Sequence, residues 1–274
     1  MKLALCCKGE QVFVAQVLPE GVRVLKEDPG PLGVASLFPT GGPVRGTSLF
    51  KPEEVQFCAP VPRPPKIICV GLNYRDHAAE TNQPLPKTPV LFNKYARAVI
   101  GPQEPIVLPQ VSEQVDYEAE LAVVIGREGK HIPEELAMEY VAGYTILNDI
   151  SARDLQMESG QWMKGKTCDT FAPMGPWLVT KDEIPDPHGL KIGLRLNGQV
   201  MQAGHTGEMI FKIPRLISYL SHLFTLEVGD IIATGTPAGV GFTRQPPVFL
   251  RAGDVVEVEI EGIGVLTNPV RKEA

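Results

Sequence analysis

The chain has 274 residues, of which 43% are hydrophobic and 21% charged. This composition is ordinary for a soluble globular protein, and the length allows one large domain or a large domain with a small appendage. The formal net charge of −6 argues against nucleic acid as the main partner, because phosphate backbones bind basic surfaces. No apolar run approaches the length of a transmembrane helix, so we expect no membrane partner.

Cysteine usage indicates a reducing compartment. The five cysteines are odd in number and show no CxxC spacing; they are Cys6, Cys7, Cys58, Cys69 and Cys168. This pattern favours neither a disulfide framework nor a structural zinc site. The first eight residues turn polar too soon for a signal peptide. We therefore predict a cytoplasmic protein.

The first 60 residues form a predicted β-rich unit. Apolar runs at 3–7, 11–17 and 21–25 are short strand candidates separated by turn residues. Residues 28–52 are rich in Pro and Gly and carry little periodic signal. The proline-rich stretch 59–65 has the composition of a stiff linker. We therefore predict a small domain at 1–60 and a larger catalytic domain at 61–274.

The larger region reads as short strands with few helices. Strands are expected at 66–70, 90–92, 106–108, 144–147, 230–233, 254–260 and 264–267. We expect a short helix within the second half of 72–81. Further helices are expected from Pro133 to Gly143, after Ser151 in a capping box with Asp154, and from Pro214 onward. The predicted fold class is mainly β with a few helices (α+β).

One acidic strand carries the strongest chemical signal. From Val115 to Ile125 the side chains alternate, with Asp116, Glu118 and Glu120 on one face. An edge strand with a solvated acidic face is one explanation. The apolar run after Glu120 instead favours a strand buried on both faces, where carboxylates need a partner. A divalent metal is the leading candidate.

A fourth acid joins this site in the prediction. Asp149 lies at an expected strand-to-helix junction, although a turn aspartate without any ligand is the alternative. With Glu118 and Glu120 it would supply only oxygen ligands. Such a set favours Mg²⁺ or Mn²⁺ over zinc.

Two further clusters could move or stabilise charge. His77 and Glu80 are three positions apart, hence on one face of the expected helix. Glu80 could orient the imidazole so that His77 takes a proton from water, although an exposed surface pair is the alternative. Lys164 and Lys166 are candidates for a cation that stabilises an enolate oxygen, although lysines usually lie at the surface.

Five stretches form an ordered set of motifs. They are Val-Gly-Leu-Asn-Tyr-Arg-Asp-His at 70–77, Asp-Tyr-Glu-Ala-Glu-Leu at 116–121, Asn-Asp-Ile-Ser-Ala-Arg-Asp-Leu-Gln at 148–156, Trp-Met-Lys-Gly-Lys at 162–166 and Gly-Asp-Ile-Ile-Ala-Thr-Gly-Thr-Pro-Ala-Gly-Val-Gly at 229–241. Together they resemble the fumarylacetoacetate hydrolase family. Its shorter members are the nearest match: acylpyruvate hydrolases, oxaloacetate decarboxylases and 2-hydroxyhepta-2,4-diene-1,7-dioate isomerases.

The resemblance implies a mixed β-sandwich roll, a homodimer and a set of site residues. The implied metal ligands are Glu118, Glu120 and Asp149, without Asp116. The implied catalytic residues are His77, Glu80 and Lys166, the last in preference to Lys164. The implied substrate-binding residues are Arg153, Gln156 and Thr236. Larger members carry one more acidic ligand ahead of the motif histidine, and residues 67–73 hold no acid. We therefore expect water or substrate to fill more of the metal's coordination shell.

The predicted reaction uses Mg²⁺ (or Mn²⁺) and a 2-oxo acid or its enol, through a metal-stabilised enolate. Hydrolysis of a C–C bond in an acylpyruvate-type substrate ranks first, because the histidine–glutamate pair is intact. The alternatives are isomerisation of 2-hydroxyhepta-2,4-diene-1,7-dioate (a 5-carboxymethyl-2-hydroxymuconate-type isomerase or decarboxylase) or decarboxylation of oxaloacetate, within aromatic or keto-acid catabolism. Both need the same enolate without an attacking water. A non-catalytic metal- or metabolite-binding protein is a third hypothesis.

Overall fold

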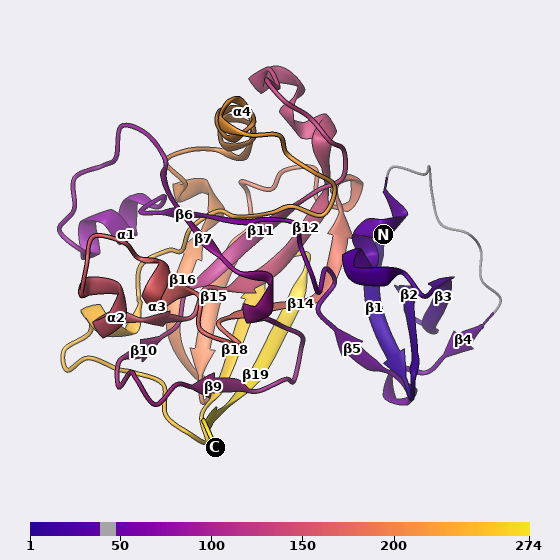
Figure 1. The fold of residues 1–274 in the computed structure, drawn as a ribbon, viewed down its shortest axis with the longest axis horizontal. Helices are drawn as coiled ribbons and strands as arrows, with labels where there is room; N and C mark the ends of the chain where they lie inside the picture. Colours follow the sequence, from indigo (N-terminus) through magenta and orange to yellow (C-terminus); the bar gives the residue numbers. More distant parts are fainter. Residues whose placement is uncertain (39–47) are drawn as a thin grey trace.

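The structure is a computed structural model that describes residues 1–38 and 48–274. Residues 39–47 of the Pro- and Gly-rich segment lie outside this description. The strands of the largest sheet are β1 (Lys2–Lys8), β2 (Gln11–Leu18), β3 (Gly21–Glu27), β4 (Leu49–Phe50), β5 (Gln56–Cys58), β6 (Ile67–Gly71), β7 (Val90–Lys94), β8 (Val99–Ile100), β11 (Ala119–Ile125), β12 (Val141–Asn148), β14 (Ala172–Thr180) and β17 (Ile231–Ala233). Their order is β4-β3-β2-β1-β14-β12-β11-β17-β6-β7, with β5 beside β1 and β8 beside β14 (Figure 1).

A smaller sheet covers one side of this large one. Its order is β16-β15-β18-β19-β9, formed by β9 (Ile106–Leu108), β15 (Lys191–Leu196), β16 (Gln199–His205), β18 (Val255–Ile260) and β19 (Gly264–Lys272). Leu121 and Val123 of β11 share an apolar cluster with Leu194 of β15 and Val258 of β18. The prediction of a mainly β fold with few helices, arranged as a mixed sandwich, is confirmed.

The central strand β11 is buried on both faces. Leu121 and Val123 belong to the cluster between the sheets, whereas Ala122 and Val124 pack in a second cluster on the other face. Successive side chains of a strand point to opposite faces, so this alternation places each apolar residue of β11 in a core. The acidic residues at and just before the start of this strand, Glu120 and Glu118, are therefore buried.

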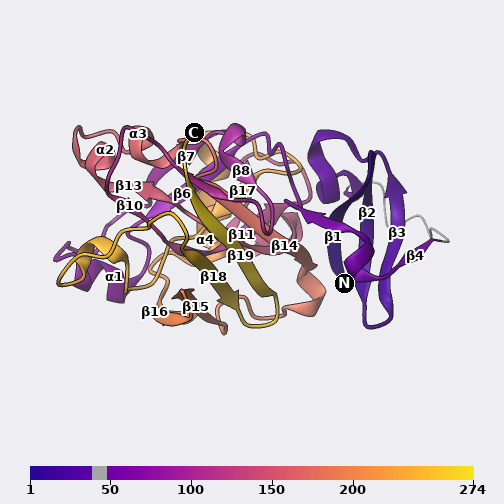
Figure 2. The same ribbon diagram turned by 90° about the horizontal axis from the view of Figure 1, so that it is seen from below.

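The amino-terminal strands extend the same large sheet. Strand β1 pairs with β14 through Lys2 opposite Val179 and Leu3 opposite Leu178, and Leu5 packs in the second apolar cluster. Figures 1 and 2 place β1–β4 as a lobe at one end of the molecule. The division into domains at residue 60 stays a prediction.

Four α-helices, within the part of the chain described, interrupt the strands. They are α1 (Arg75–Glu80), α2 (Arg153–Met157), α3 (Met163–Lys166) and α4 (Ile213–Leu223). The helix predicted from Pro214 is confirmed as α4, and the one within 72–81 is α1. Both ribbon views gather α1, α2 and α3 at the end of the molecule opposite β1–β4 (Figure 2).

Two predicted helix boundaries are wrong. The segment after Pro133 is a 3-10 helix, Glu134–Tyr140, and Gly143 lies inside β12 instead of ending a helix. A Cβ on Gly143 would lie 2.2 Å from the carbonyl oxygen of Val179, so glycine serves close strand packing there. The capping box at Ser151 is also absent. Ser151 is part of β13 (Ser151–Ala152), and its hydroxyl donates to the carbonyl of Asp149.

The predicted acidic strand is also interrupted. Strand β10 (Val115–Asp116) pairs with β13 in a separate small sheet, and β11 begins only at Ala119. Side-chain acceptors replace the sheet bonds between them, because the carboxylate of Asp116 accepts the N–H of Tyr117 and the side-chain oxygen of Asn148 accepts the N–H of Glu118. Asp116, Glu118 and Glu120 therefore lie at the break between β10 and β11, beside the apolar core.

Candidate active site

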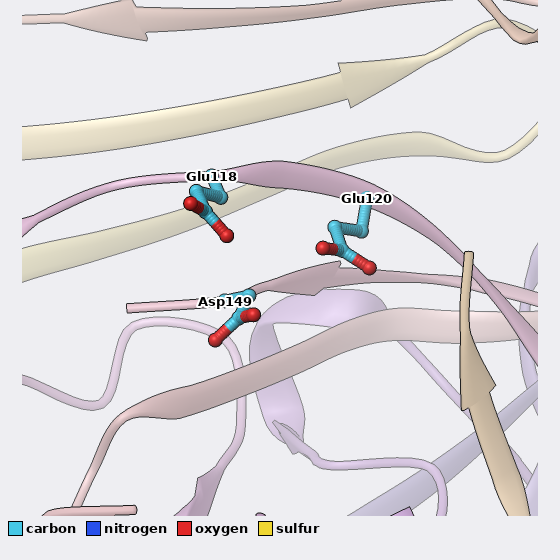
Figure 3. A group of neighbouring side chains, drawn as sticks. All are labelled: Glu118, Glu120 and Asp149. Carbon is cyan, nitrogen blue, oxygen red and sulfur yellow. The ribbon is translucent and has the colours of Figure 1, made fainter. Parts of the chain in front are cut away.

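Three carboxylates meet where β11 and β12 run side by side. Glu118 immediately precedes β11, Glu120 is its second residue, and Asp149 immediately follows β12. One carboxylate oxygen of each lies within 4.8 Å of the others, and all three side chains are buried. Figure 3 shows the three carboxylates directed into one shared space. The antiparallel pairing of Ala119 with Asn148 brings these distant sequence positions together.

Two lysines enter this group from other elements. The ammonium of Lys166, at the end of α3, lies 2.7 Å from Glu118 Oε2 and 2.9 Å from Asp149 Oδ2. The ammonium of Lys94, at the end of β7, lies 2.7 Å from Asp149 Oδ1. Lys164 instead forms an exposed ion pair with Glu158. The structure therefore places Lys166, and not Lys164, beside the carboxylates.

Arg153 joins the acids on the other side. Its Nε donates to Asp116 Oδ2 at 2.9 Å, its Nη2 to Glu118 Oε1 at 2.7 Å and its Nη1 to Gln156 Oε1 at 3.0 Å. The guanidinium lies 4.4 Å from the ring centroid of Phe242. Arg153 thus provides the counter-charge of the buried Asp116 carboxylate.

The pKa values of the two glutamates shift in opposite directions. Burial raises the pKa of Glu118, but the charges of Lys166 and Arg153 outweigh it and hold this pKa below its usual value. Burial, together with the charges of Asp149 and Glu118, raises the pKa of Glu120 well above its usual value. Its hydrogen bond from the N–H of Gly235, 2.8 Å long, does not compensate.

A divalent cation fits this arrangement of charges. Among the described residues, Glu120 takes part in no ion pair, whereas Glu118 and Asp149 each have cationic partners. A buried carboxylate without a counter-charge is costly, and a hard cation among oxygen ligands would supply one. Glu118, Glu120 and Asp149 are therefore suited to hold a metal ion together.

The histidine pair lies at the same cavity. His77 and Glu80 are on α1, with Nδ1 and Oε2 3.3 Å apart, and His77 is only 7% exposed. Glu80 Oε1 accepts hydrogen bonds from the N–H of Gly239 and the hydroxyl of Thr243, both 2.9 Å long. Burial raises the pKa of Glu80, but the hydrogen bonds from His77, Thr243 and Gly239 outweigh it and lower the pKa. Such a charged, anchored carboxylate holds the imidazole in one orientation.

Many of these groups line one cavity of about 260 Å³. Its lining includes every predicted site residue apart from Glu80 and Asp149. The lining residues are Val70, Gly71, Leu72, His77, Thr81, Gln83, Phe92, Glu118, Glu120, Arg153, Gln156, Met157, Trp162, Lys166, Thr236 and Phe242. Thr236 Oγ1 accepts from Gln202 Nε2 at 2.8 Å, so its own hydroxyl hydrogen is free to turn toward a ligand.

Two residues of the site gave no signal in the sequence. Lys94 is completely buried and reads in the sequence as one more lysine after a strand. Gln202 lies in β16, where its Oε1 accepts the N–H of Ala119 while its Nε2 holds Thr236. Only tertiary packing brings these polar groups to the site.

Residues 66–271 match the family model described as fumarylacetoacetate (FAA) hydrolase, C-terminal. The chain belongs to the fumarylacetoacetate hydrolase family. The resemblance drawn from the five motifs is thereby confirmed. No helix in the described part of this family member is long and apolar enough to cross a membrane.

Individual relatives carry several activities in their names. Human mitochondrial oxaloacetate tautomerase FAHD2A is 55% identical over 220 residues, which span 80% of this chain and 70% of the human protein. A fumarylacetoacetate hydrolase structure from Exiguobacterium antarcticum is 36% identical with a TM-score of 0.88, and both chains are fully covered. A 5-carboxymethyl-2-hydroxymuconate delta-isomerase structure from Mycobacterium smegmatis is 39% identical with a TM-score of 0.85, again over both full chains.

Proposed function

We propose that this enzyme interconverts the keto and enol forms of a small 2-oxo dicarboxylic acid of the oxaloacetate type. One observation carries the proposal: a cavity of about 260 Å³ is lined by His77, Lys166 and acidic side chains suited to a divalent cation. Proton removal beside a carbonyl needs a base and positive charge at the developing enolate oxygen, and these groups can supply both.

The metal site would consist of Glu118, Glu120 and Asp149, with Mg²⁺ or Mn²⁺ as the proposed ion. When bound, such an ion supplies Lewis-acid polarisation of a 2-oxo group. Because Lys166 already shares oxygens of Glu118 and Asp149, its ammonium would stay beside the ion site.

His77 would move the proton. Glu80 accepts from Nδ1, which leaves the lone pair on Nε2, and this nitrogen would take the proton from C3 of the keto acid and return it. The hydrogen bonds that Gly239 and Thr243 donate to Glu80 keep the pair aligned. Because His77 is only 7% exposed, few bulk waters would reach its imidazole during this transfer.

The remaining polar groups would orient the acid. Lys166 uses two ammonium hydrogens for Glu118 and Asp149, so the third is available to a substrate oxygen. Arg153 has five donors; Nε and Nη2 face Asp116 and Glu118, and Nη1 donates once to Gln156, so the second N–H of Nη1 is available to a carboxylate. The hydroxyl of Thr236 and the amide of Gln156 would add neutral contacts.

Names of relatives favour tautomerisation over the hydrolysis that ranks first from the sequence. Proteins 54–56% identical are named oxaloacetate tautomerases, and a structure 39% identical is named an isomerase. C–C hydrolysis remains the second candidate because a structure at 36% identity is a fumarylacetoacetate hydrolase and the same histidine could activate water.

The test starts from oxaloacetic acid dissolved in its enol form. Loss of the enol's ultraviolet absorbance is followed with enzyme in Mg²⁺ or Mn²⁺, and after dialysis against EDTA. We expect metal-dependent acceleration without pyruvate formation, which a lactate dehydrogenase coupling would detect. Equal decay with and without enzyme would refute the proposal. Cleavage of an acylpyruvate instead would establish the hydrolase.

Location and assembly stay predictions. The cytoplasm was predicted from the sequence, whereas the tautomerases at 54–56% identity carry the word mitochondrial in their names. The homodimer predicted from the family resemblance would be measured by light scattering of the purified protein.

A further inference from the structure

Two cysteines meet in the amino-terminal lobe, away from the cavity lining. Cys7 of β1 and Cys58 of β5 have their Sγ atoms 2.7 Å apart, with one thiol donating to the other. The strands are antiparallel neighbours in which Cys7 lies opposite Gln56 and Cys58 opposite Leu5. The two thiols are therefore diagonal neighbours on one face of the sheet. Since a disulfide bond measures about 2.05 Å, a movement of less than about 1 Å would join them.

We propose that Cys7 and Cys58 form an oxidant-sensitive dithiol, which closes to a disulfide with hydrogen peroxide as the oxidant. Both side chains are partly exposed, so a small oxidant can reach them. Cys6 points to the opposite face of β1, where it is buried in a separate apolar cluster. This proposal goes beyond the reaction proposed for the cavity and does not depend on it.

The reaction with peroxide balances without any other reactant. Burial, and then the hydrogen bond with Cys7, raise the pKa of Cys58, so we assign the first attack to the sulfur of Cys7. That sulfur attacks one peroxide oxygen, the O–O bond breaks, and Cys7 becomes a sulfenic acid as the first water leaves. The sulfur of Cys58 then attacks the sulfur of Cys7 and displaces the second water. Two thiols are oxidised by two electrons and one peroxide is reduced.

The bond would secure a short strand. Strand β5 is held to β1 by three residue pairs only, from Leu5–Cys58 to Cys7–Gln56. The backbone after β5 packs closely on Gly101, where an added Cβ would lie 2.6 Å from the amide nitrogen of Ala59. A link between positions 51 apart in the sequence also restricts the unfolded chain. Oxidation should therefore stabilise the lobe and suppress opening of β5.

The experiment treats the 274-residue protein with hydrogen peroxide, quenches it, unfolds it and alkylates the remaining thiols with iodoacetamide. Intact mass spectrometry should then count five alkylated cysteines in the reduced protein and three after oxidation, with a cross-linked peptide joining Cys7 to Cys58. Dithiothreitol should restore five. The melting temperature should rise by roughly 5–10 °C on oxidation, and amide exchange at residues 56–58 should slow.

Matched variants identify the pair. Cys7→Ser should keep all four remaining thiols alkylatable after oxidant. Cys58→Ser should lose at most the Cys7 thiol, as a sulfenic acid without any cross-linked peptide, whereas Cys168→Ser should still lose two. Five alkylated cysteines in the oxidised wild type would overturn the proposal, as would the loss of two thiols in Cys7→Ser. A disulfide between two chains, seen as a dimer on a non-reducing gel, would also overturn it. Because none of these readouts uses the enol assay, failure here leaves the proposed function untouched.

Discussion

Replacing the buried Lys94 with methionine tests how the site is held together. Its ammonium lies 2.7 Å from Asp149 Oδ1 and donates to the backbone carbonyls of Ile150, Lys166 and Phe171. Methionine has a similar length but no donor, so the substitution leaves a buried carboxylate oxygen and three carbonyls without this partner. Removing one member of a buried ion pair costs about 3–5 kcal/mol. The remaining contact of Asp149 with Lys166 keeps the expected loss within that range.

Urea unfolding in EDTA at pH 7.5, followed by circular dichroism, measures this loss. We expect the free energy of unfolding to fall by about 3–5 kcal/mol. This loss should appear as a lower urea midpoint with an unchanged slope, because unfolding exposes the same surface in both proteins. Lys164→Met is the matched control. Lys164 is about half exposed in its ion pair with Glu158, so its loss should stay below about 1 kcal/mol. A Lys94→Met variant within 1 kcal/mol of wild type would refute the role given to this lysine.

Four further outcomes follow from the site and the cores. Lys166→Met should lower kcat by a factor on the order of 10²–10³. Near-normal turnover in Lys166→Met, together with a large loss in Lys164→Met, would show that Lys164 is the catalytic lysine instead. His77→Ala should abolish the enzyme's acceleration of enol decay while Mn²⁺ binding, measured by calorimetry, is retained; wild-type rates would reduce the histidine to a structural role. Glu120→Gln should weaken Mn²⁺ binding by at least about tenfold in the same calorimetric titration, and unchanged affinity would remove it from the ligand set. Burial, then the neighbouring Cys7, raise the pKa of Cys6 to about 12, so its thiolate fraction at pH 8.5 is on the order of 10⁻³–10⁻⁴; native-state alkylation of Cys6 as fast as in urea would contradict this.

Local patterns were sufficient to locate most strands and to nominate the candidate residues. The expected strand at 106–108 is β9, and the one at 254–260 is β18 (Val255–Ile260) within one residue. Period-two alternation and β-branched runs report burial directly, so they locate strands without knowledge of their partners. The acids at 118 and 120 were identified for the same reason, because carboxylates next to an apolar strand need compensation wherever that strand is placed.

Boundaries that depend on a distant partner could not be read locally. Gly143 resembles a helix end in the sequence, yet it is required by the approach of Val179 from β14. The break at Tyr117 and Glu118 exists because Asn148 and the loop at Gly241 offer hydrogen-bond partners from elsewhere in the chain. Where the local sequence pattern and the tertiary contacts favour different boundaries, the tertiary packing decides where the helix or strand ends.

The sequence by itself determined the family resemblance and the β-rich class, and it proposed the acids, His77 and Lys166 as the groups that carry the chemistry. Tertiary structure alone decided how these charges are paired. It placed Lys166 between Glu118 and Asp149, left Glu120 without an ion pair among the described residues, and buried Lys94 beneath the site. The physical reason is that electrostatic energies depend on distance and burial, and neither quantity is encoded in the spacing of residues along one strand.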